Sequence, residues 1–144
     1  MTDGKAGRLD EIIASHIRRE GPLLPILHDV QAEFGYVSED TKRRLAKALN
    51  VTRAEIQGVV SFYHDFHDEK AEHPILKLCR AESCKSRGVE ALVEGAEAVA
   101  KGRVEIETIY CLGLCSVGPN AMVGTDVYAR LDAKKLATLI EEIA

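Results

Sequence analysis

Four cysteines in two close pairs constrain this chain more than any other feature of its sequence. The first pair, Cys79 and Cys84, has the spacing C-x4-C, and the second pair, Cys111 and Cys115, has the spacing C-x3-C. Each pair directly follows a short stretch whose apolar pattern predicts a β-strand. If the two strands are neighbours in one sheet, two loops present four thiols around one small volume.

The elements around the cysteines follow the order β-α-β-β-α. Strands are predicted at 75–78 and 104–110, with an amphipathic helix between them that ends at Gly102. A hairpin follows around Gly124, formed by 121–123 and 127–131, and Asp132 is a predicted N-cap of the last helix. This order is that of a minimal thioredoxin-like domain with a mixed sheet. The predicted fold class is therefore α+β or α/β in this half.

The first half of the chain reads as a bundle of short helices. The first begins with an apolar face that runs from Leu9 to Ile17 and ends at Gly21 and Pro22. The next begins near Pro22 or Pro25 and stops at Gly35. The third and fourth have clear start signals, namely Ser38 as an N-cap, and a Thr52/Glu55 capping box with a Val51/Ile56 hydrophobic staple. The polar segment 64–74 lacks periodicity, so we divide the chain into a helical region, 1–70, and a second domain, 71–144.

The composition of the 144 residues excludes several classes of partner. A formal net charge of -4 and a pI near 5.7 provide no basic field for a phosphate backbone, so nucleic acid is not expected. The first ten residues contain no apolar signal region, and no stretch is long and apolar enough for membrane insertion. We therefore expect a cytoplasmic protein, in which thiols stay reduced.

Under reducing conditions, four paired cysteines indicate metal binding or redox chemistry. A [2Fe-2S] cluster needs two sulfurs for each iron, and two adjacent loops can supply them. Zinc is an alternative, although structural zinc sites more often use C-x2-C; a dithiol role is another, although no C-x-x-C is present. Five nearby residues are assigned to the surroundings of the cluster, two glycines that bring backbone N–H groups to the sulfurs and three cations that offset its charge: Gly113, Gly118, Arg80, Lys85 and Arg87.

Longer stretches around the cysteines resemble a known family. They are Tyr110-Cys-Leu-Gly-Leu-Cys-Ser-Val-Gly-Pro-Asn-Ala-Met122 after the C-x4-C pair, and Leu23–Gln31, Phe34–Val37 and Gly58–Tyr63 in the helical half. The chain resembles the thioredoxin-like [2Fe-2S] subunit of NADH dehydrogenases, the family that contains the 24 kDa subunit of respiratory complex I. Within it, Ser61–Phe66 and Tyr110–Cys115 look most like the gamma subunit of NAD-dependent formate dehydrogenase.

The resemblance implies one [2Fe-2S] cluster on Cys79, Cys84, Cys111 and Cys115, and a role in single-electron transfer. It implies a partner flavoprotein subunit that binds FMN and NAD(H), and a larger molybdenum and iron-sulfur subunit. The chain itself has no G-x-G-x-x-G and no P-loop, so we assign it no catalytic residue and expect no catalysis by it alone. Alternatives are a complex I or hydrogenase diaphorase subunit, a free-standing ferredoxin and a zinc-stabilised interaction module.

The five histidines are interpreted as structural or surface residues. His64, His67 and His73 could form a second metal site with nearby aspartates, but their segment is better explained as a solvated linker. His16 and His28 lie on or near apolar helix faces, so we expect partial burial with a satisfied hydrogen bond for each.

An aromatic group and a basic run in the helical half each have two interpretations. Phe62, Tyr63 and Phe66 either dock a partner or pin the helical half onto the sheet. The run Lys42-Arg-Arg44 is expected to be the solvated face of its helix, with an acidic patch of a partner as the alternative.

Overall fold

A computed structural model describes residues 3–144 of the chain. The chain divides into two compact units, Met1–Ala71 and Glu72–Ala144. We call them the N-terminal unit and the C-terminal unit. Within residues 3–144, no helix combines the length and apolar character that crossing a bilayer requires.

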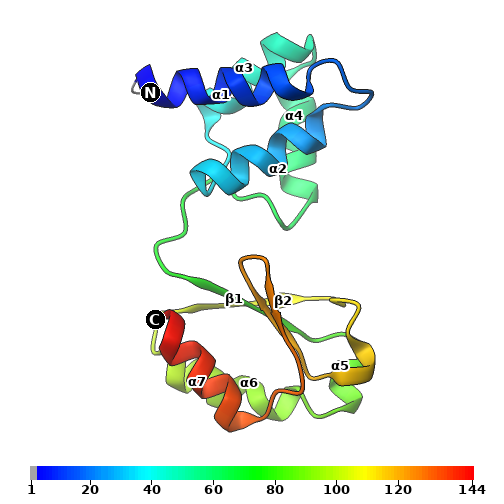
Figure 1. Ribbon diagram of the computed structural model, residues 1–144, viewed down its shortest axis with the longest axis vertical. Helices are drawn as coiled ribbons and strands as arrows, with labels where there is room; N and C mark the ends of the chain where they lie inside the picture. Colours follow the sequence, from blue (N-terminus) through cyan, green and yellow to red (C-terminus); the bar gives the residue numbers. More distant parts are fainter. Residues whose placement is uncertain (1–2) are drawn as a thin grey trace. The chain divides into compact units, whose positions relative to one another are not determined.

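The N-terminal unit consists of four helices, as predicted: α1 (Asp3–His16), α2 (Leu23–Phe34), α3 (Glu39–Leu49) and α4 (Arg53–Phe62) (Figure 1). The apolar residues of the predicted faces form one core, together with Val37 and Phe66 from the connecting segments. The members of this core are Leu9, Ile12, Ile13, Ile26, Leu27, Val30, Val37, Leu45, Ile56, Val60 and Phe66. Helix α1 ends at His16, before Ile17, which lies exposed rather than on the buried face.

The predicted capping signals determine where these helices begin and end. Ser38 Oγ accepts a hydrogen bond from the backbone N–H of Thr41 at 3.2 Å, and Thr52 and Glu55 form both bonds of a capping box. Gly35 ends α2 with φ 79°, a left-handed conformation that glycine adopts without a steric penalty. The helix boundaries are therefore set by local residues, as expected.

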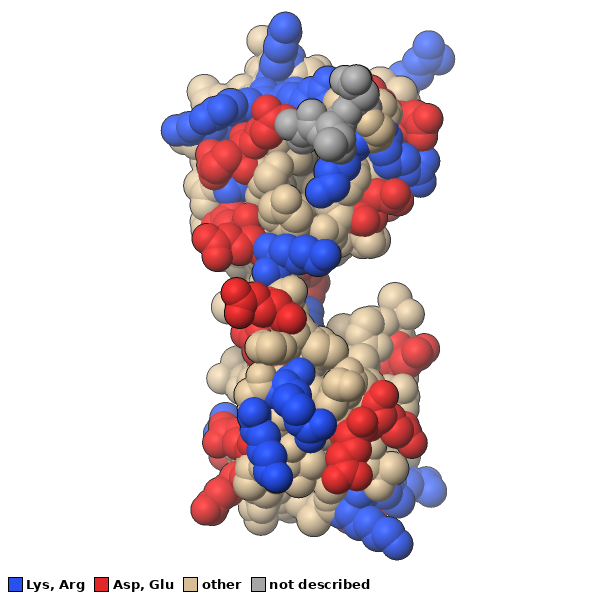
Figure 2. All heavy atoms as spheres, turned by 90° about the vertical axis from the view of Figure 1, so that its left-hand side faces the viewer, with Lys and Arg blue, Asp and Glu red and all other residues tan. Residues whose placement is uncertain are grey.

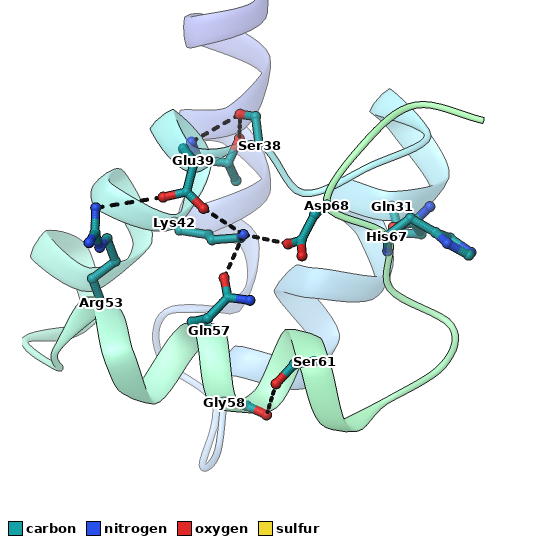
Figure 3. Close-up of polar contacts among 11 residues, drawn as sticks. Gln31, Ser38, Glu39, Lys42, Arg53, Gln57, Gly58, Ser61, His67 and Asp68 are labelled. Atoms are coloured by element: carbon teal, nitrogen blue, oxygen red, sulfur yellow. Dashed lines mark hydrogen bonds and ion pairs between the residues drawn. The ribbon is translucent and has the colours of Figure 1, made fainter. Parts of the chain in front are cut away.

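The prediction of a solvated face for Lys42–Arg44 was wrong for Lys42, whereas Arg43 is exposed and Arg44 is half-buried. The lysine side chain is only 1% exposed, and its Nζ donates to Glu39 Oε1 at 2.8 Å, to Gln57 Oε1 at 2.6 Å and to Asp68 (Figure 3). Burial by itself lowers the pKa of Lys42, but the hydrogen bonds to Asp68 and Glu39 raise it above its usual value. The ammonium thus joins α3, α4 and the segment that follows α4.

The segment after α4 folds back onto the N-terminal unit. His67 N–H donates to Gln31 Oε1 at 3.0 Å, and His67 carbonyl accepts from Val37 N–H at 2.7 Å. Phe66 is buried in the core of this unit, whereas Phe62 is 74% exposed and Tyr63 is 40% exposed. Two of the three grouped aromatics are therefore left on the surface.

We expected partial burial and a hydrogen bond for two histidines of the helical bundle, and the structure confirms this for one of them. His16 is partly buried, and its Nε2 lies 2.6 Å from Asp29 Oδ2, which confirms the expectation. His28 is exposed, so the expected partial burial was wrong for this residue. Its ring lies beside the core residue Phe66, with the two ring centroids 4.9 Å apart. His28 lies one position beyond Leu27 on α2, which turns it away from the buried face.

The C-terminal unit is a mixed four-stranded sheet with helices packed against it. Its elements are β1 (Ile75–Cys79), α5 (Glu82–Ser86), α6 (Glu90–Ala100), β2 (Glu105–Ile109), the 3-10 turn η1 (Cys115–Val117), β3 (Ala121–Val123), β4 (Asp126–Tyr128) and α7 (Ala133–Ile143). The strand order is β2-β1-β3-β4, with β1 parallel to β2 and the other pairs antiparallel. Helices α6 and α7 lie together against the sheet (Figure 1).

The hairpin differs in detail from its prediction. Strand β4 begins at Asp126 and stops at Tyr128, so the turn is the two-residue Gly124-Thr125 and the predicted strand end at Leu131 was wrong. Arg130 has a φ of 50°, and its N–H donates to Val117 carbonyl, which takes the chain out of the ladder. Asp132 then caps α7 as predicted, accepting from Lys135 N–H at 2.8 Å.

Charged side chains of both signs lie on the face drawn in Figure 2. On the face in Figure 2, lysine and arginine lie among aspartate and glutamate on each unit, and neither sign forms a continuous field.

Candidate metal centre

The sheet brings the two cysteine pairs to one edge. In the parallel pair β1–β2, Cys79 lies opposite Ile109, so Cys111 leaves β2 two residues beyond that position. Arg80 N–H donates to Ile109 carbonyl at 3.0 Å and extends the contact between the two chain segments past the strand ends. The two strands are neighbours, which was the condition on which the predicted meeting of the cysteines rested.

The first pair does not lie on a loop as expected, because Cys84 is part of the short helix α5. Both Cys79 and Cys84 are almost fully buried. Each of these two thiols shifts the pKa of the other. Five helical residues without a side-chain N-cap leave no periodicity that sequence patterns could detect.

The second pair sits on a tight turn with both thiols exposed. Cys111 and Gly113 both have a φ of 75°, and the N–H of Gly113 donates to Cys111 Sγ at 3.4 Å, as predicted for this glycine. Cys111 Sγ and Cys115 Sγ lie 3.6 Å apart. Two sulfurs on one tetrahedral metal with bonds of roughly 2.3 Å lie about 3.8 Å apart, so this pair fits a shared iron.

Gly118 lies so close to the Cys84 sulfur that a side chain would not fit there without a shift. A Cβ at this position would lie 3.1 Å from Cys84 Sγ and 3.2 Å from Arg87 Cδ. Its backbone φ of -69° is open to any residue, so the constraint is space. The sequence predicts that Gly118 lets a backbone N–H approach the sulfurs; the structure gives this glycine a steric reason instead.

The thiols influence one another electrostatically. Burial raises the pKa of Cys79, but hydrogen bonds led by the backbone N–H of Ala81 and of Cys111 hold it below its usual value. Burial and the hydrogen bond with Cys79 raise the pKa of Cys84, while the backbone N–H of Asn120 acts in the opposite direction. A hydrogen bond with Cys111 and the charge of Cys111 raise the pKa of Cys115. Four such thiols are stabilised as thiolates together when they bind metal.

Two of the cations assigned to the cluster are already paired with carboxylates. Arg80 holds Glu90 with two hydrogen bonds, at 2.9 and 2.6 Å, and Lys85 Nζ lies 3.6 Å from Glu82. Arg87 is exposed and its side chain lies beside Gly118. The idea that Arg80 and Lys85 act mainly by offsetting cluster charge is therefore weakened, since each already faces an acid.

The donor set fits a two-iron cluster better than a single ion. Across residues 3–144, no three or more His, Cys, Asp or Glu side chains surround one point closely enough to hold one metal ion as they stand. The cysteines form two pairs, one buried and one exposed, rather than one tetrahedron. His64, in the N-terminal unit, and His73, in the C-terminal unit, are both exposed.

A family model described as thioredoxin-like [2Fe-2S] ferredoxin matches residues 9–144. The chain belongs to this family. The predicted resemblance is thereby confirmed at family level, and one [2Fe-2S] cluster is the cofactor that the family name carries. The mixed sheet with its helices is likewise the thioredoxin-like fold that was expected.

Named relatives of this thioredoxin-like ferredoxin are subunits of larger enzymes. It is 30% identical to the HndA subunit of an NADP-reducing hydrogenase from Solidesulfovibrio fructosivorans, over 92% of this chain and 82% of the relative. It is 31% identical to an NADH-quinone oxidoreductase subunit from Rhizobium meliloti, over 92% and 86%. It is 28% identical to another NADH-quinone oxidoreductase subunit, from Thermus thermophilus, over 91% and 82%.

A solved structure has the same fold. The air-oxidised NAD+-reducing [NiFe]-hydrogenase contains a chain that superposes with a TM-score of 0.71 at 26% identity over 84% of this ferredoxin. The match spans only 22% of that chain. The ferredoxin thus corresponds to one part of a longer chain in that hydrogenase.

Sequence reasoning missed one residue of the site, Asn120. It is 1% exposed, its Nδ2 donates to Leu114 carbonyl at 3.0 Å, and its own carbonyl accepts from Cys79 N–H at 3.0 Å. A polar residue between Pro119 and the apolar strand β3 was the available signal, because such a residue rarely stays buried without a specific contact.

Proposed function

We propose that Cys79, Cys84, Cys111 and Cys115 ligate one [2Fe-2S] cluster and that the chain is the electron-transfer subunit of a cytoplasmic, NAD-linked flavoprotein complex. The observation that carries this proposal is the meeting of two cysteine pairs at one edge of the sheet, with Cys79 on β1 and Cys111 just beyond β2. Such a cluster accepts and donates one electron at a time.

The two cysteine pairs would hold opposite sides of the cluster. Cys79 and Cys84 anchor one side within the core, where backbone N–H groups stabilise the Cys79 thiolate. Cys111 and Cys115 hold the exposed side, beside the exposed Tyr110, so electrons enter and leave there. The buried pair keeps water from that side of the site.

The hydride chemistry belongs to a partner. The chain lacks a Gly-rich phosphate cradle, so the proposed flavoprotein subunit binds FMN and NAD(H) and exchanges single electrons with this chain. Relatives named as NADH-quinone oxidoreductase and hydrogenase subunits support such an assembly.

Within this class we propose an NAD-dependent formate dehydrogenase, with the chain as its gamma subunit beside a larger molybdenum and iron-sulfur subunit. This narrower proposal rests on the resemblance of Ser61–Phe66 and Tyr110–Cys115 alone. A complex I subunit or a hydrogenase diaphorase subunit is the second candidate, favoured by the names of the relatives.

The exposed aromatics support a docking role for the N-terminal unit. Phe62 and Tyr63 form a T-shaped pair with ring centroids 5.2 Å apart and are not used in the core of that unit. Exposed aromatic side chains are enriched at protein interfaces. We propose that they contact the flavoprotein subunit.

The complex can be tested by isolating the tagged chain from its native host and assaying the co-purified material. Formate-dependent reduction of NAD, with a molybdenum subunit present, is expected. NADH oxidation without formate activity would replace the formate proposal with the complex I or hydrogenase candidate. A brown protein that purifies alone would be a free-standing ferredoxin.

The ligand set has its own test. Each of the four cysteines is replaced by serine, and iron and acid-labile sulfide are measured in the purified chain. We expect two irons and two sulfides per wild-type chain, as a [2Fe-2S] cluster requires, and loss of most of both in each variant. One zinc without sulfide would favour the interaction module instead.

A further inference from the structure

Asn120, the residue before strand β3, forms hydrogen bonds with chain segments that carry the cysteines. Its backbone carbonyl accepts a hydrogen bond from Cys79 N–H at 3.0 Å. Its side-chain Nδ2 donates to Leu114 carbonyl at 3.0 Å, one residue before Cys115. One residue therefore links the segment of Cys79 to the turn that carries Cys111 and Cys115.

The buried side chain of Asn120 destabilises the fold through one unpaired oxygen. Asn120 is 1% exposed, and its Oδ1 is the buried side-chain polar atom for which residues 3–144 provide no hydrogen-bond partner. A buried acceptor without a donor destabilises a fold, and an apolar residue of similar size would remove that penalty. Burial of this amide therefore has a cost that its contact with the cysteine turn has to offset.

The orientation of the amide follows from its partner. Leu114 carbonyl only accepts hydrogen bonds, so the NH2 end of Asn120 must face it. This bond crosses from the start of β3 to the turn between Cys111 and Cys115, which has exposed thiols and a φ of 75° at both Cys111 and Gly113. Leu112 packs against the core and Ser83 Oγ donates to Cys115 carbonyl at 3.3 Å, and the amide of Asn120 adds a contact at Leu114, between these two points.

We propose that Asn120 is a positioning residue for the cluster, whose side-chain amide holds the Cys111–Cys115 turn against the buried pair Cys79 and Cys84. The inference rests on the proposed ligand set. It assigns the backbone of Asn120 to the buried pair and its side chain to the exposed pair. Residues that orient metal ligands typically change metal affinity 10- to 100-fold when they are replaced.

Two substitutions separate positioning from packing. Asn120→Leu keeps roughly the size of the side chain, removes the donor to Leu114 and also removes the unpaired Oδ1. Asn120→Ala removes the same donor and leaves space. Ile140→Val, in the buried face of α7, is the control for a small loss of core packing away from the cysteines.

The full-length chain is reconstituted with ferrous iron and sulfide, and the loss of visible absorbance is followed after addition of a chelator. We expect Asn120→Leu to lose its cluster about tenfold faster than wild type. Its reduced form should show shifted or broadened electron paramagnetic resonance lines. Its urea midpoint without metal should equal or exceed that of wild type, so that cluster retention and fold stability move in opposite directions.

Ile140→Val should show the reverse pattern, with a lower urea midpoint and an unchanged spectrum. If Asn120→Leu retains its cluster within twofold of wild type and its spectrum is unchanged, Asn120 only fills space and the inference is wrong. It is also wrong if both Asn120 variants lose fold stability together with the cluster. A wild-type chain that takes up no [2Fe-2S] cluster would instead overturn the proposed function.

Discussion

At the scale of single residues, Gly118 and Asn120 occupy adjacent parts of one short segment and constrain the metal centre in different ways. Gly118 leaves room for the Cys84 sulfur, because a Cβ would lie 3.1 Å from it. Asn120 adds contacts to Cys79 and to Leu114. Neither residue is among the proposed ligands, yet both contact the segments that carry them.

Gly118→Ala should weaken the metal centre without unfolding the unit. The added methyl group overlaps the buried Cys84 sulfur, and overpacking of this kind costs about 1–3 kcal/mol. We expect a several-fold faster loss of the cluster to a chelator and a changed visible circular dichroism spectrum.

Gly95→Ala is the matched control for this substitution. Gly95 lies within α6, and a Cβ there meets nothing within 4 Å. Alanine should raise helix stability by roughly 0.5–1 kcal/mol and leave the spectrum unchanged. Equal cluster retention in both variants would show that the sulfur tolerates the methyl group.

At the scale of elements, the ammonium of Lys42 holds α3, α4 and the following segment together. Its acceptors are Glu39 on its own helix, Gln57 on α4 and Asp68 beyond α4 (Figure 3). The same segment is bound through the backbone of His67. Polar contacts therefore complete a helical core that apolar packing begins.

Lys42→Met should destabilise the N-terminal unit by roughly 1–2 kcal/mol at neutral pH, because three hydrogen bonds to the ammonium are lost. The pKa of Lys42 is raised on folding, so its contribution is complete below the unfolded value of about 10.4 and disappears as the pH rises through the folded pKa. Wild type should lose urea resistance in that alkaline range, and Lys42→Met should lose less.

At acid pH the stability of the N-terminal unit should change in the opposite direction, falling as the pH falls. Hydrogen bonding to Lys42 lowers the pKa of Glu39, so the stability gained from this carboxylate is present above about pH 4.3 and is lost as the pH falls further. Lys47→Met, at an exposed position of α3, is the control and should follow wild type at both ends. A Lys47 variant that matched Lys42→Met would assign the effect to net charge. The midpoints can be read from methyl resonances of Val37 and Val60.

At the scale of the whole molecule, each unit has a core of its own. The cysteines all belong to the C-terminal unit, and the exposed aromatic pair Phe62 and Tyr63 belongs to the N-terminal unit. The proposed binding of the cluster and the proposed docking therefore involve different side chains. This separation makes the two roles testable one at a time.

Phe62→Ser should weaken association with the flavoprotein subunit by about tenfold, as expected when an exposed aromatic anchor is removed. The cluster content and its spectrum should stay as in wild type. Binding is measured by titrating the purified chain onto the immobilised partner. Ile17→Ser removes another exposed apolar side chain of the same unit and shows whether any such loss has the same effect. Unchanged binding of Phe62→Ser would exclude these aromatics from the interface.

Local signals in the sequence predicted the elements and their ends. Ser38, Thr52, Gly35 and Asp132 each act on groups within a few residues, so their roles are visible without the fold. The alternation of apolar residues predicted β1 and β2, and the spacing of the cysteines predicted that they meet once these strands pair.

The sequence by itself therefore determined the fold class, the family and the residues proposed as ligands, because these depend on short-range patterns and on residue chemistry. Only the tertiary structure decided that Cys84 lies in a helix, that Lys42 is buried and that Asn120 spans the cysteine segments. The burial of Lys42 and the contact of Asn120 with Cys79 depend on partners far away in the chain, such as Asp68 for Lys42. Contacts of that kind arise from how elements pack, and no local pattern encodes them.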